Sequence, residues 1–331
     1  MRSILCSIVL ASLALAGCGG SSSDDAAPQG AAGGNVRLVA YSTPREAYAK
    51  LIDLYKSGSG EGVEFDQSYG ASGEQSRAVE AGLKADVVAF SLEPDMTRLV
   101  EDDIVPTDWN AGEHKGMVTD SVVVFVVRDG NPKGIHDWDD LVKEGVEVVT
   151  PNPFTSGGAR WNVMAAYGAQ LKQGKTEEQA RDYLTDLFHN VTVQDKSARE
   201  SLTTFAAGKG DVLLAYENEA IFAKKQGQPF EYVVPDQTIL IENPVAATKD
   251  ASAAGKEFVD FLFTDKAQKV FGDEGYRPVS KAVLATFDFP TPPSLFTIAD
   301  LGGWNTVQTE FFDRESGFMA KVQKEVGQPT E

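Results

Sequence analysis

The chain has 331 residues, of which 42 % are hydrophobic, 24 % are charged and 31 are glycine. This composition excludes a disordered chain, a collagen-like chain and a small disulfide scaffold, and the length favours two domains over one. The 49 acidic residues outnumber the 30 basic ones, which gives a formal net charge of −19. Because such a surface repels polyanions, nucleic acids and acidic lipid headgroups are disfavoured as partners.

Residues 1–17 have the pattern of a cleaved bacterial signal peptide. A short positive start precedes the apolar run 4–16, which is too short to cross a bilayer, since a spanning helix needs about 20 residues. The run ends in LAGC at 15–18, which resembles the lipobox of bacterial lipoproteins, where the cysteine carries a diacylglyceryl, palmitate-type lipid. We expect a lipid anchor on Cys18 at the outer face of the cytoplasmic membrane, on its periplasmic or extracellular side. The alternative is an ordinary signal peptide cut near Ala16, with Cys18 left as a free thiol.

Both cysteines belong to this leader region, because Cys6 lies within the signal peptide and Cys18 would carry the lipid. The folded part is therefore predicted to contain no disulfide, thiolate nucleophile or cysteine metal site. Residues 18–35 are rich in Gly, Ser and Ala and cannot bury enough surface to fold, which predicts a flexible tether.

From Val36 onward, strand-like and helix-like segments alternate, which is typical of parallel sheets covered by helices. The first part predicts strands at 36–41, 63–69 and 86–90 and helices at 44–55 and 73–82. The second part predicts strands at 121–128, 146–150, 191–194 and 212–216 and helices at 157–173, 176–189 and 198–207. After these come a strand at 239–247, broken by Pro244, and helices at 252–262, 265–272 and 306–326.

This order predicts an α/β fold with two domains and a cleft between them. In open α/β sheets, ligands collect at the carboxyl ends of the strands. The strand-to-helix turns beside the cleft are therefore the expected site of ligand binding.

The turn at 151–162 is the densest cluster of small and polar residues, and it lies between a predicted strand and a helix. Gly157 and Gly158 let backbone N–H groups approach a ligand, Ser156 adds a hydroxyl donor, and the helix N-terminus adds about half a positive charge. This layout is typical of an oxyanion site. A plain N-cap serine, followed by glycines that ease a tight turn, explains it equally well.

Other strand-to-helix turns share this layout. Ser72 lies in the turn at 69–75, Ala198 in the turn at 195–199, and Ser42 in the turn at 41–44. Each is a weak signal alone, because most such turns in α/β proteins look similar. Their occurrence in both predicted domains strengthens the interpretation that an anion is bound in the cleft.

A series of longer sequence words runs from about residue 36 to about residue 300. The words are GASGEQ at 70–75, RDGNP at 128–132, IHDW at 135–138, TPNP at 150–153, SGGARWN at 156–162, GDVLLA at 210–215 and ENEA at 217–220. In wording, order and spacing, the chain resembles the sulfate- and thiosulfate-binding proteins that deliver the anion to an ATP-driven importer.

The resemblance implies a two-domain periplasmic-binding-protein fold of type II, in which the ligand cleft lies between two parallel or mixed-sheet α/β domains joined by two hinge strands. With that fold, residues 36–118 and 239–331 would form domain I, residues 119–238 would form domain II, and the chain would cross between them near 118–120 and 237–239. It implies an extracytoplasmic protein that captures sulfate, possibly thiosulfate, and delivers it to ABC transporter permease subunits. In that family the anion is held by uncharged donors, and the matching positions here are Ser42, Ser72, Ser156, Gly157, Gly158, Ala198 and Tyr216.

Two of these positions depart from the family pattern, because Ser42 stands where aspartate is common and Tyr216 where tryptophan is common. The change at Ser42 spares a backbone donor. The change at Tyr216 matters more, since an indole N–H only donates whereas a phenol also accepts. Sulfate has acceptors only, but monohydrogen phosphate carries a proton that needs an acceptor. A lining of donors therefore favours sulfate, and we expect Tyr216 to weaken that preference.

The remaining features predict a carrier without a cofactor. Arg160 is expected to support the site without contacting the anion. His114, His136 and His189 are scattered without metal-ligand spacing, and no general base for an enzyme is evident. We expect a monomer. The alternatives are a receptor for phosphate or molybdate, an enzyme acting on sulfate or phosphate esters, and a sensory or adhesive lipoprotein.

Overall fold

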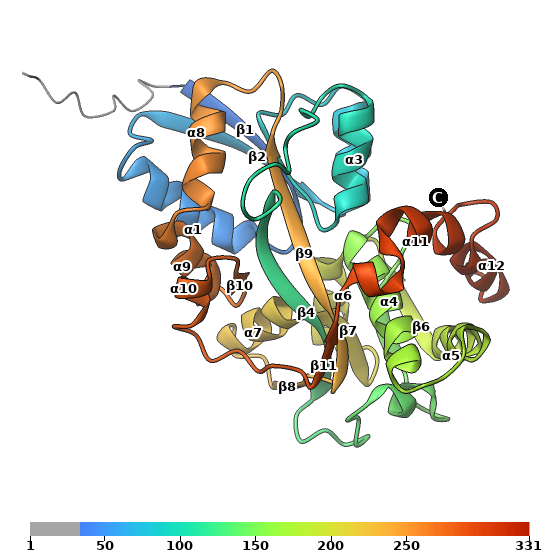
Figure 1. Ribbon diagram of the computed structural model, residues 1–331. Coiled ribbons are helices and arrows are strands. Elements are labelled where there is room, and N and C mark those ends of the chain that lie inside the picture. The colour runs from blue at the N-terminus through green and yellow to red at the C-terminus, as the bar shows by residue number, and fades with distance from the viewer. Residues whose placement is uncertain (1–33, 331) are drawn as a thin grey trace, which may run out of the picture.

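The computed structural model describes residues 34–330 (Figure 1). The predicted signal peptide, the lipid anchor on Cys18 and the tether up to residue 33 lie outside these residues and stay predictions. Within 34–330, no helix combines the length and the apolar character that crossing a membrane requires.

The first α/β unit is built on parallel strands in the order β2-β1-β3, and β9 pairs antiparallel with β3. The strands are β1 (Gly34–Tyr41), β2 (Val63–Gly70), β3 (Val87–Ala89) and β9 (Gln237–Ala247). The helices are α1 (Arg45–Lys56), α2 (Ser72–Glu80), α3 (Glu93–Glu101), α8 (Ala253–Leu262) and α9 (Asp265–Asp273). Alternate residues of β1 pack to opposite faces, since Leu38 joins the core with α1 and α8 while Val39 joins the core with α2 and α3.

The second α/β unit is a mixed sheet in the order β8-β4-β7-β5-β6. Its strands are β4 (Met117–Arg128), β5 (Val148–Pro151), β6 (Val191–Asp195), β7 (Val212–Tyr216) and β8 (Phe230–Val233). Its helices are the short 3-10 helix η1 (Trp138–Val142), α4 (Gly157–Lys172), α5 (Glu177–His189), α6 (Ala198–Ala206) and α7 (Glu217–Lys225). β4 is nearly all valine in its centre because both of its faces are buried.

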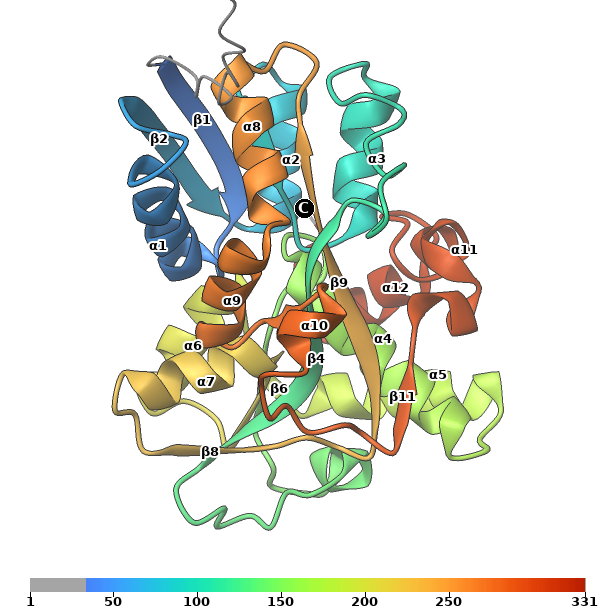
Figure 2. The same cartoon turned by 60° about the vertical axis from the view of Figure 1, so that its left-hand side comes forward.

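Strands β4 and β9 connect the two units. They pair antiparallel with each other between 117–122 and 240–244, and then each continues into the sheet of one unit (Figure 2). The predicted two-domain α/β fold is therefore confirmed. The predicted break of β9 at Pro244 is wrong: the strand continues because the register shifts near Pro244, and its carbonyl accepts the N–H of Phe90 at 3.0 Å.

The C-terminal segment differs most from the sequence prediction. A single helix was expected at 306–326, but the chain forms α11 (Gly303–Phe311) and α12 (Phe318–Glu325). The carboxylate of Asp313 accepts the N–H groups of Glu315 and Ser316, which stabilises the turn that separates them. Before these helices come β10 (Arg277–Pro278), α10 (Lys281–Leu284), β11 (Ser294–Phe296) and the 3-10 helix η2 (Ile298–Leu301).

The C-terminal helices pack on the second unit. The rings of Trp304 and Trp161 lie 4.7 Å apart, and those of Phe311 and Tyr167 lie 4.8 Å apart. All four side chains share one buried core with α5. The domain boundaries stay a prediction, and this packing favours assigning 294–330 to the second unit and not, as the sequence suggested, to domain I.

Candidate functional site

A small cavity lies where the two units meet. Its volume is about 10 Å³, which leaves room for the centre of about one water-sized group. The lining residues are Tyr41, Ser42, Thr43, Ala71, Ser72 and Ser91 from the first unit and Ser156, Gly158, Ala198 and Tyr216 from the second. All the site residues predicted from the sequence are therefore in the lining except Gly157.

Gly157 lies beside the cavity and touches the opposite unit. A Cβ atom at this position would lie 2.6 Å from Ser91 Oγ and 2.9 Å from Leu92 Cδ2. These contacts are shorter than any that real Cβ atoms make. Glycine is therefore required here for the two units to approach as closely as they do.

The N-terminus of α4 supplies the predicted donors of the second unit. Ser156 is the N-cap, and its Oγ accepts the N–H of Ala159 at 3.4 Å. Because this bond uses an oxygen lone pair, the hydroxyl proton of Ser156 is free to be donated. The N–H groups of Gly157 and Gly158 belong to the first turn and have no partner within the helix. A Cβ on Gly158 would lie 3.4 Å from the Tyr216 ring, so this stretch of backbone runs along the cavity.

The N-terminus of α2 looks similar in sequence but is arranged differently. Ala71 is the N-cap, and Ser72 is the first helical residue, so the prediction that Ser72 precedes the helix is wrong by one position. Ser72 Oγ donates to Asp95 Oδ2 at 2.6 Å and accepts from Ser91 N at 2.9 Å. Since its hydroxyl proton is committed to a carboxylate, Ser72 can offer a ligand only its backbone N–H.

The first turn of α6 and the end of β1 complete the lining. Ala198 is the first residue of α6, which is capped by Ser197 Oγ through the N–H of Glu200 at 3.3 Å. Ser42 lies in the turn between β1 and α1, where the backbone is not part of either element. The N-termini of α2, α4 and α6 thus converge on the cavity, each with about half a positive charge.

Tyr216 and Ser91 meet across the two units. Their hydroxyl oxygens lie 2.6 Å apart. Burial raises the pKa of the Tyr216 phenol well above its usual range, so the phenol keeps its proton. The Ser91 carbonyl accepts from Trp161 Nε1 at 2.8 Å and from Asn243 Nδ2 at 2.9 Å, which holds Ser91 in place.

Ser91 was missed by the sequence analysis. It directly follows the predicted strand 86–90, as Ser42 directly follows the strand 36–41. That position was the available signal, but no glycine follows it and the helix α3 that begins at Glu93 was not predicted. Tyr41, Thr43 and Ala71 were also missed, although each adjoins a predicted residue.

Charged side chains surround the cavity without lining it. Among residues 34–330, no charged side chain contributes to the lining. Arg199, next to Ala198, joins the units by donating to Glu46 Oε1 on α1 at 2.8 Å and to Glu219 Oε1 on α7 at 2.9 Å. Arg160 Nε donates to the Pro153 carbonyl at 2.8 Å, which places its guanidinium behind the turn that precedes α4.

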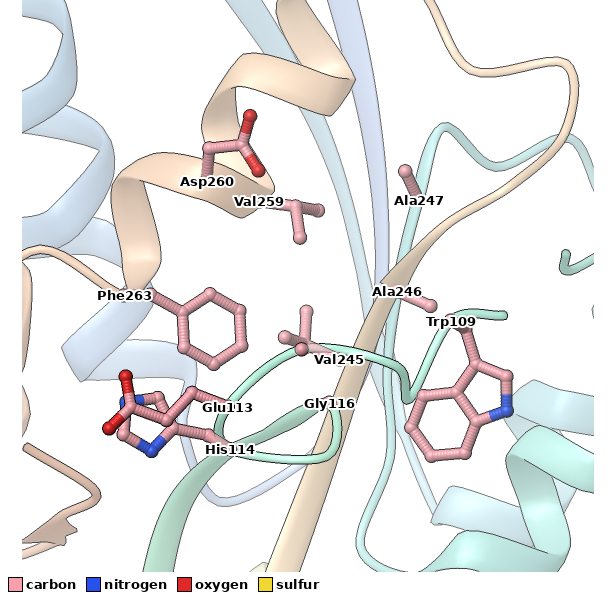
Figure 3. Close-up of a pocket in the computed structure, with 11 residues that line it drawn as sticks. Trp109, Glu113, His114, Gly116, Val245, Ala246, Ala247, Val259, Asp260 and Phe263 are labelled. Atoms are coloured by element: carbon pink, nitrogen blue, oxygen red, sulfur yellow. The ribbon is translucent and has the colours of Figure 1, made fainter. Parts of the chain in front are cut away.

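A larger pocket, about 460 Å³, lies in the first unit beside β9 and α8. Figure 3 shows Trp109 on one side of it and Phe263 with His114 on the other. His114 stacks on the Phe263 ring with centroids 5.9 Å apart. No helix N-terminus opens into the lining, so the pocket does not have the donors of an anion site. In the described part of the chain, no group of three or more His, Cys, Asp or Glu side chains is placed to hold a metal ion.

Comparison with known proteins identifies the family. Residues 36–277 match the family described as bacterial extracellular solute-binding protein. The chain belongs to this family. This solute-binding protein is 43 % identical to a sulfate-binding protein of Synechococcus elongatus, over 98 % of this chain and 97 % of the relative. It is 35 % identical to a thiosulfate-binding protein of Pseudomonas aeruginosa, over 83 % of this chain and 88 % of the relative.

A solved structure supports both the family and the fold. The sulfate-binding protein of Mycobacterium tuberculosis is 44 % identical to this solute-binding protein, with a TM-score of 0.82, over 84 % of this chain and 99 % of that one. The family resemblance predicted from the sequence words is therefore confirmed, as is the type II binding-protein fold.

Proposed function

We propose that this solute-binding protein captures sulfate or thiosulfate outside the cytoplasm and delivers it to the permease of an ABC importer. The observation that carries the proposal is the lining of the cavity between the units, where N–H groups of α2, α4 and α6 converge and charged side chains are absent among the described residues. The relatives that are named for sulfate and thiosulfate support the same ligand class.

The proposed donors suit a dianion that carries no proton. Helix ends of about +0.5 charge each offset most of the charge of sulfate, and each hydrogen bond to a charged group stabilises the complex by about 1.5–3 kcal/mol. The negative charge of the whole chain therefore does not prevent binding. Donors for the anion are proposed to come from Ser42, Ser72, Ser156, Gly157, Gly158, Ala198 and Tyr216.

The Tyr216–Ser91 pair bears on the choice between anions. The hydroxyl groups share one hydrogen bond, so one of their protons remains for a ligand, while lone pairs on both oxygens remain as acceptors. An indole at position 216 would supply a donor and no acceptor. We therefore keep the expectation that Tyr216 lets monohydrogen phosphate compete better than tryptophan would.

The proposed carrier makes and breaks no covalent bond. Its proposed working motion is closure of the two units around the anion about β4 and β9, in a monomer tethered through a lipid on Cys18. A micromolar dissociation constant corresponds to about −8 kcal/mol, which suits capture from a dilute medium.

Labelling with palmitate tests the proposed lipid anchor. Labelling of wild type that is lost in Cys18→Ala would support the anchor, and equal labelling of the two proteins would contradict it.

Titration calorimetry tests the ligand. Residues 19–331 would be titrated with sulfate, thiosulfate, phosphate and molybdate at one ionic strength. We expect micromolar or tighter binding of sulfate or thiosulfate and little heat from phosphate. Tighter binding of phosphate or molybdate would identify a different oxyanion receptor, and no binding of any of these anions would contradict the proposal.

A further inference from the structure

A group of arginines surrounds the contact between the two units near the cavity. Arg98 is paired with Asp95 at 3.2 Å, and Arg160 is bound to the Pro153 carbonyl and to Gln308. The side chains of Arg77 on α2 and of Arg314, between α11 and α12, form no hydrogen bond or ion pair with any residue in 34–330. The charges of Asp95 and Glu74 offset part of the charge of Arg77, but no carboxylate in the described part of the chain forms an ion pair with either guanidinium.

Arg77 lies at the line where the units touch. Its Nη1 atom reaches back along α2 to within 3.1 Å of the place that a Cβ on Gly73 would occupy. The carbonyl of Thr155, in the turn before α4, lies 3.1 Å from that same place, and Asp95 Oδ1 lies 3.6 Å from it. Gly73 follows Ser72, which lines the cavity, so the guanidinium lies beside the cavity at the junction of α2 with the second unit.

Arg77 belongs to the last turn of α2, but its guanidinium reaches back to the first turn, where the Asp95 carboxylate is already bound by Ser72 and Arg98. A guanidinium beside the N-terminus of a helix faces the positive end of the helix dipole. Burial, followed by the charges of Arg314 and Arg98, lowers the pKa of Arg77. The chain has 49 acidic residues to place near its basic ones, yet none of them forms an ion pair with Arg77 among the described residues.

We propose that Arg77, assisted by Arg314, is the capture point that draws the dianion toward the cavity, while the uncharged donors alone hold it after closure. This proposal rests on the proposed sulfate function. On a chain of net charge −19, a dianion is repelled at long range, and a local positive field beside the cavity would counter that repulsion and speed association. Such steering raises association rates by about 10- to 1,000-fold and falls with ionic strength.

Stopped-flow measurement of sulfate association separates capture from holding. The proteins would be wild type, Arg77→Gln, the double variant Arg77→Gln with Arg314→Gln, and Lys256→Gln. Lys256 is an exposed cation on α8, so its variant makes the same change in net charge away from the cavity. Each protein would be measured at about 10 mM and about 500 mM sodium chloride, where the Debye length falls from about 30 Å to about 4 Å.

We expect Arg77→Gln to lower kon about 3- to 10-fold at low salt, and the double variant to lower it further. The dissociation rate should change less than about twofold, and the difference in kon should vanish at high salt. If Arg77→Gln had the same kon as Lys256→Gln, or if a rise in its koff accounted for the lost affinity, the proposal would be overturned. Sulfate binding by wild type would in that case still uphold the proposed function. Failure of wild type to bind sulfate would overturn both.

Discussion

The N-termini of α2 and α4 have nearly the same local sequence, Ser72-Gly73 and Ser156-Gly157, yet they present different groups to the cavity. Ser156 caps its helix and keeps its proton for a ligand, whereas Ser72 gives its proton to Asp95. The difference arises from a third element, because α3 places a carboxylate beside Ser72, whereas no carboxylate in residues 34–330 is hydrogen-bonded to Ser156. A serine before a glycine therefore marks a place for a donor, but tertiary contacts decide which atom donates.

The same comparison explains how a carboxylate is tolerated so close to an anion site. Asp95 is 2 % exposed, and its oxygens are bound by the Ser72 hydroxyl and by Arg98 Nη1 at 3.2 Å. These donors offset its negative charge, so Asp95 need not repel the ligand. The α2 side of the cavity thus depends on a buried network, while the α4 side depends on backbone geometry.

Backbone geometry on the α4 side predicts the largest effect. Gly157→Ala would place a Cβ 2.6 Å from Ser91 Oγ, so the units could not close as they do. We expect sulfate affinity to fall by about 5- to 150-fold, since relieving such a clash costs about 1–3 kcal/mol. Calorimetry would measure it, with Gly112→Ala as the control because a Cβ there meets no atom within 4 Å. Affinity within about threefold of wild type would contradict the role assigned to closure.

Exchanging the serines tests the comparison itself. Ser156→Ala should weaken sulfate binding about 10- to 100-fold, because a hydrogen bond to a charged ligand contributes about 1.5–3 kcal/mol. Ser72→Ala should weaken it less but lower the free energy of unfolding by about 1–3 kcal/mol, because Asp95 and the Ser91 N–H each lose a partner. Calorimetry and denaturant unfolding would separate the effects. The reverse ranking in either measurement would show that the two termini were assigned wrongly.

Tyr216, which lies between these termini, is expected to influence selectivity more than affinity. Tyr216→Trp replaces a group that accepts and donates by one that only donates. The ratio of sulfate affinity to phosphate affinity should rise by about tenfold, which is the value of one hydrogen bond. Competition calorimetry with both anions would measure the ratio. A ratio equal to that of wild type would remove Tyr216 from the account of selectivity.

Asp120 provides a contrast with Asp95, because it lacks a bound cation. It lies directly opposite Glu242 where β4 pairs with β9, and burial followed by the charge of Glu242 raises the pKa of Asp120 to about 7. In the unfolded chain the pKa is about 4. The folded state therefore holds the proton more strongly, so this contribution to stability is present below pH 4 and is lost as the pH rises to 7.

Asp120→Asn removes the carboxyl group whose ionisation lowers the stability of the folded state as the pH rises. The Tm of the variant should exceed that of wild type at pH 8, by an amount equivalent to about 1–2 kcal/mol after allowance for partial exposure. Near pH 4 the Tm of wild type should equal or exceed that of the variant. Thermal unfolding at both pH values measures the effect. A difference in Tm that did not depend on pH would contradict the raised pKa.

The predictable parts of the molecule were those determined by local pattern. The turn that contains Ser156 and Gly158 stands out because two glycines follow a capping residue after an apolar strand. Ser91 and its bond to Tyr216 could not be predicted, because the two residues lie 125 positions apart and meet only through closure. Helix α3 was not predicted, although Met96 and Leu99 have helical spacing and Pro94 lies in its first turn.

The most direct test of the central claim is a crystal structure of the protein with sulfate. We expect sulfate oxygens within about 3 Å of the backbone nitrogens of Gly157, Gly158 and Ala198 and of Ser156 Oγ, with no guanidinium in contact with the anion. Sulfate held directly by Arg77 or Arg160, or bound in the pocket of Figure 3, would contradict the claim that uncharged donors alone hold the anion.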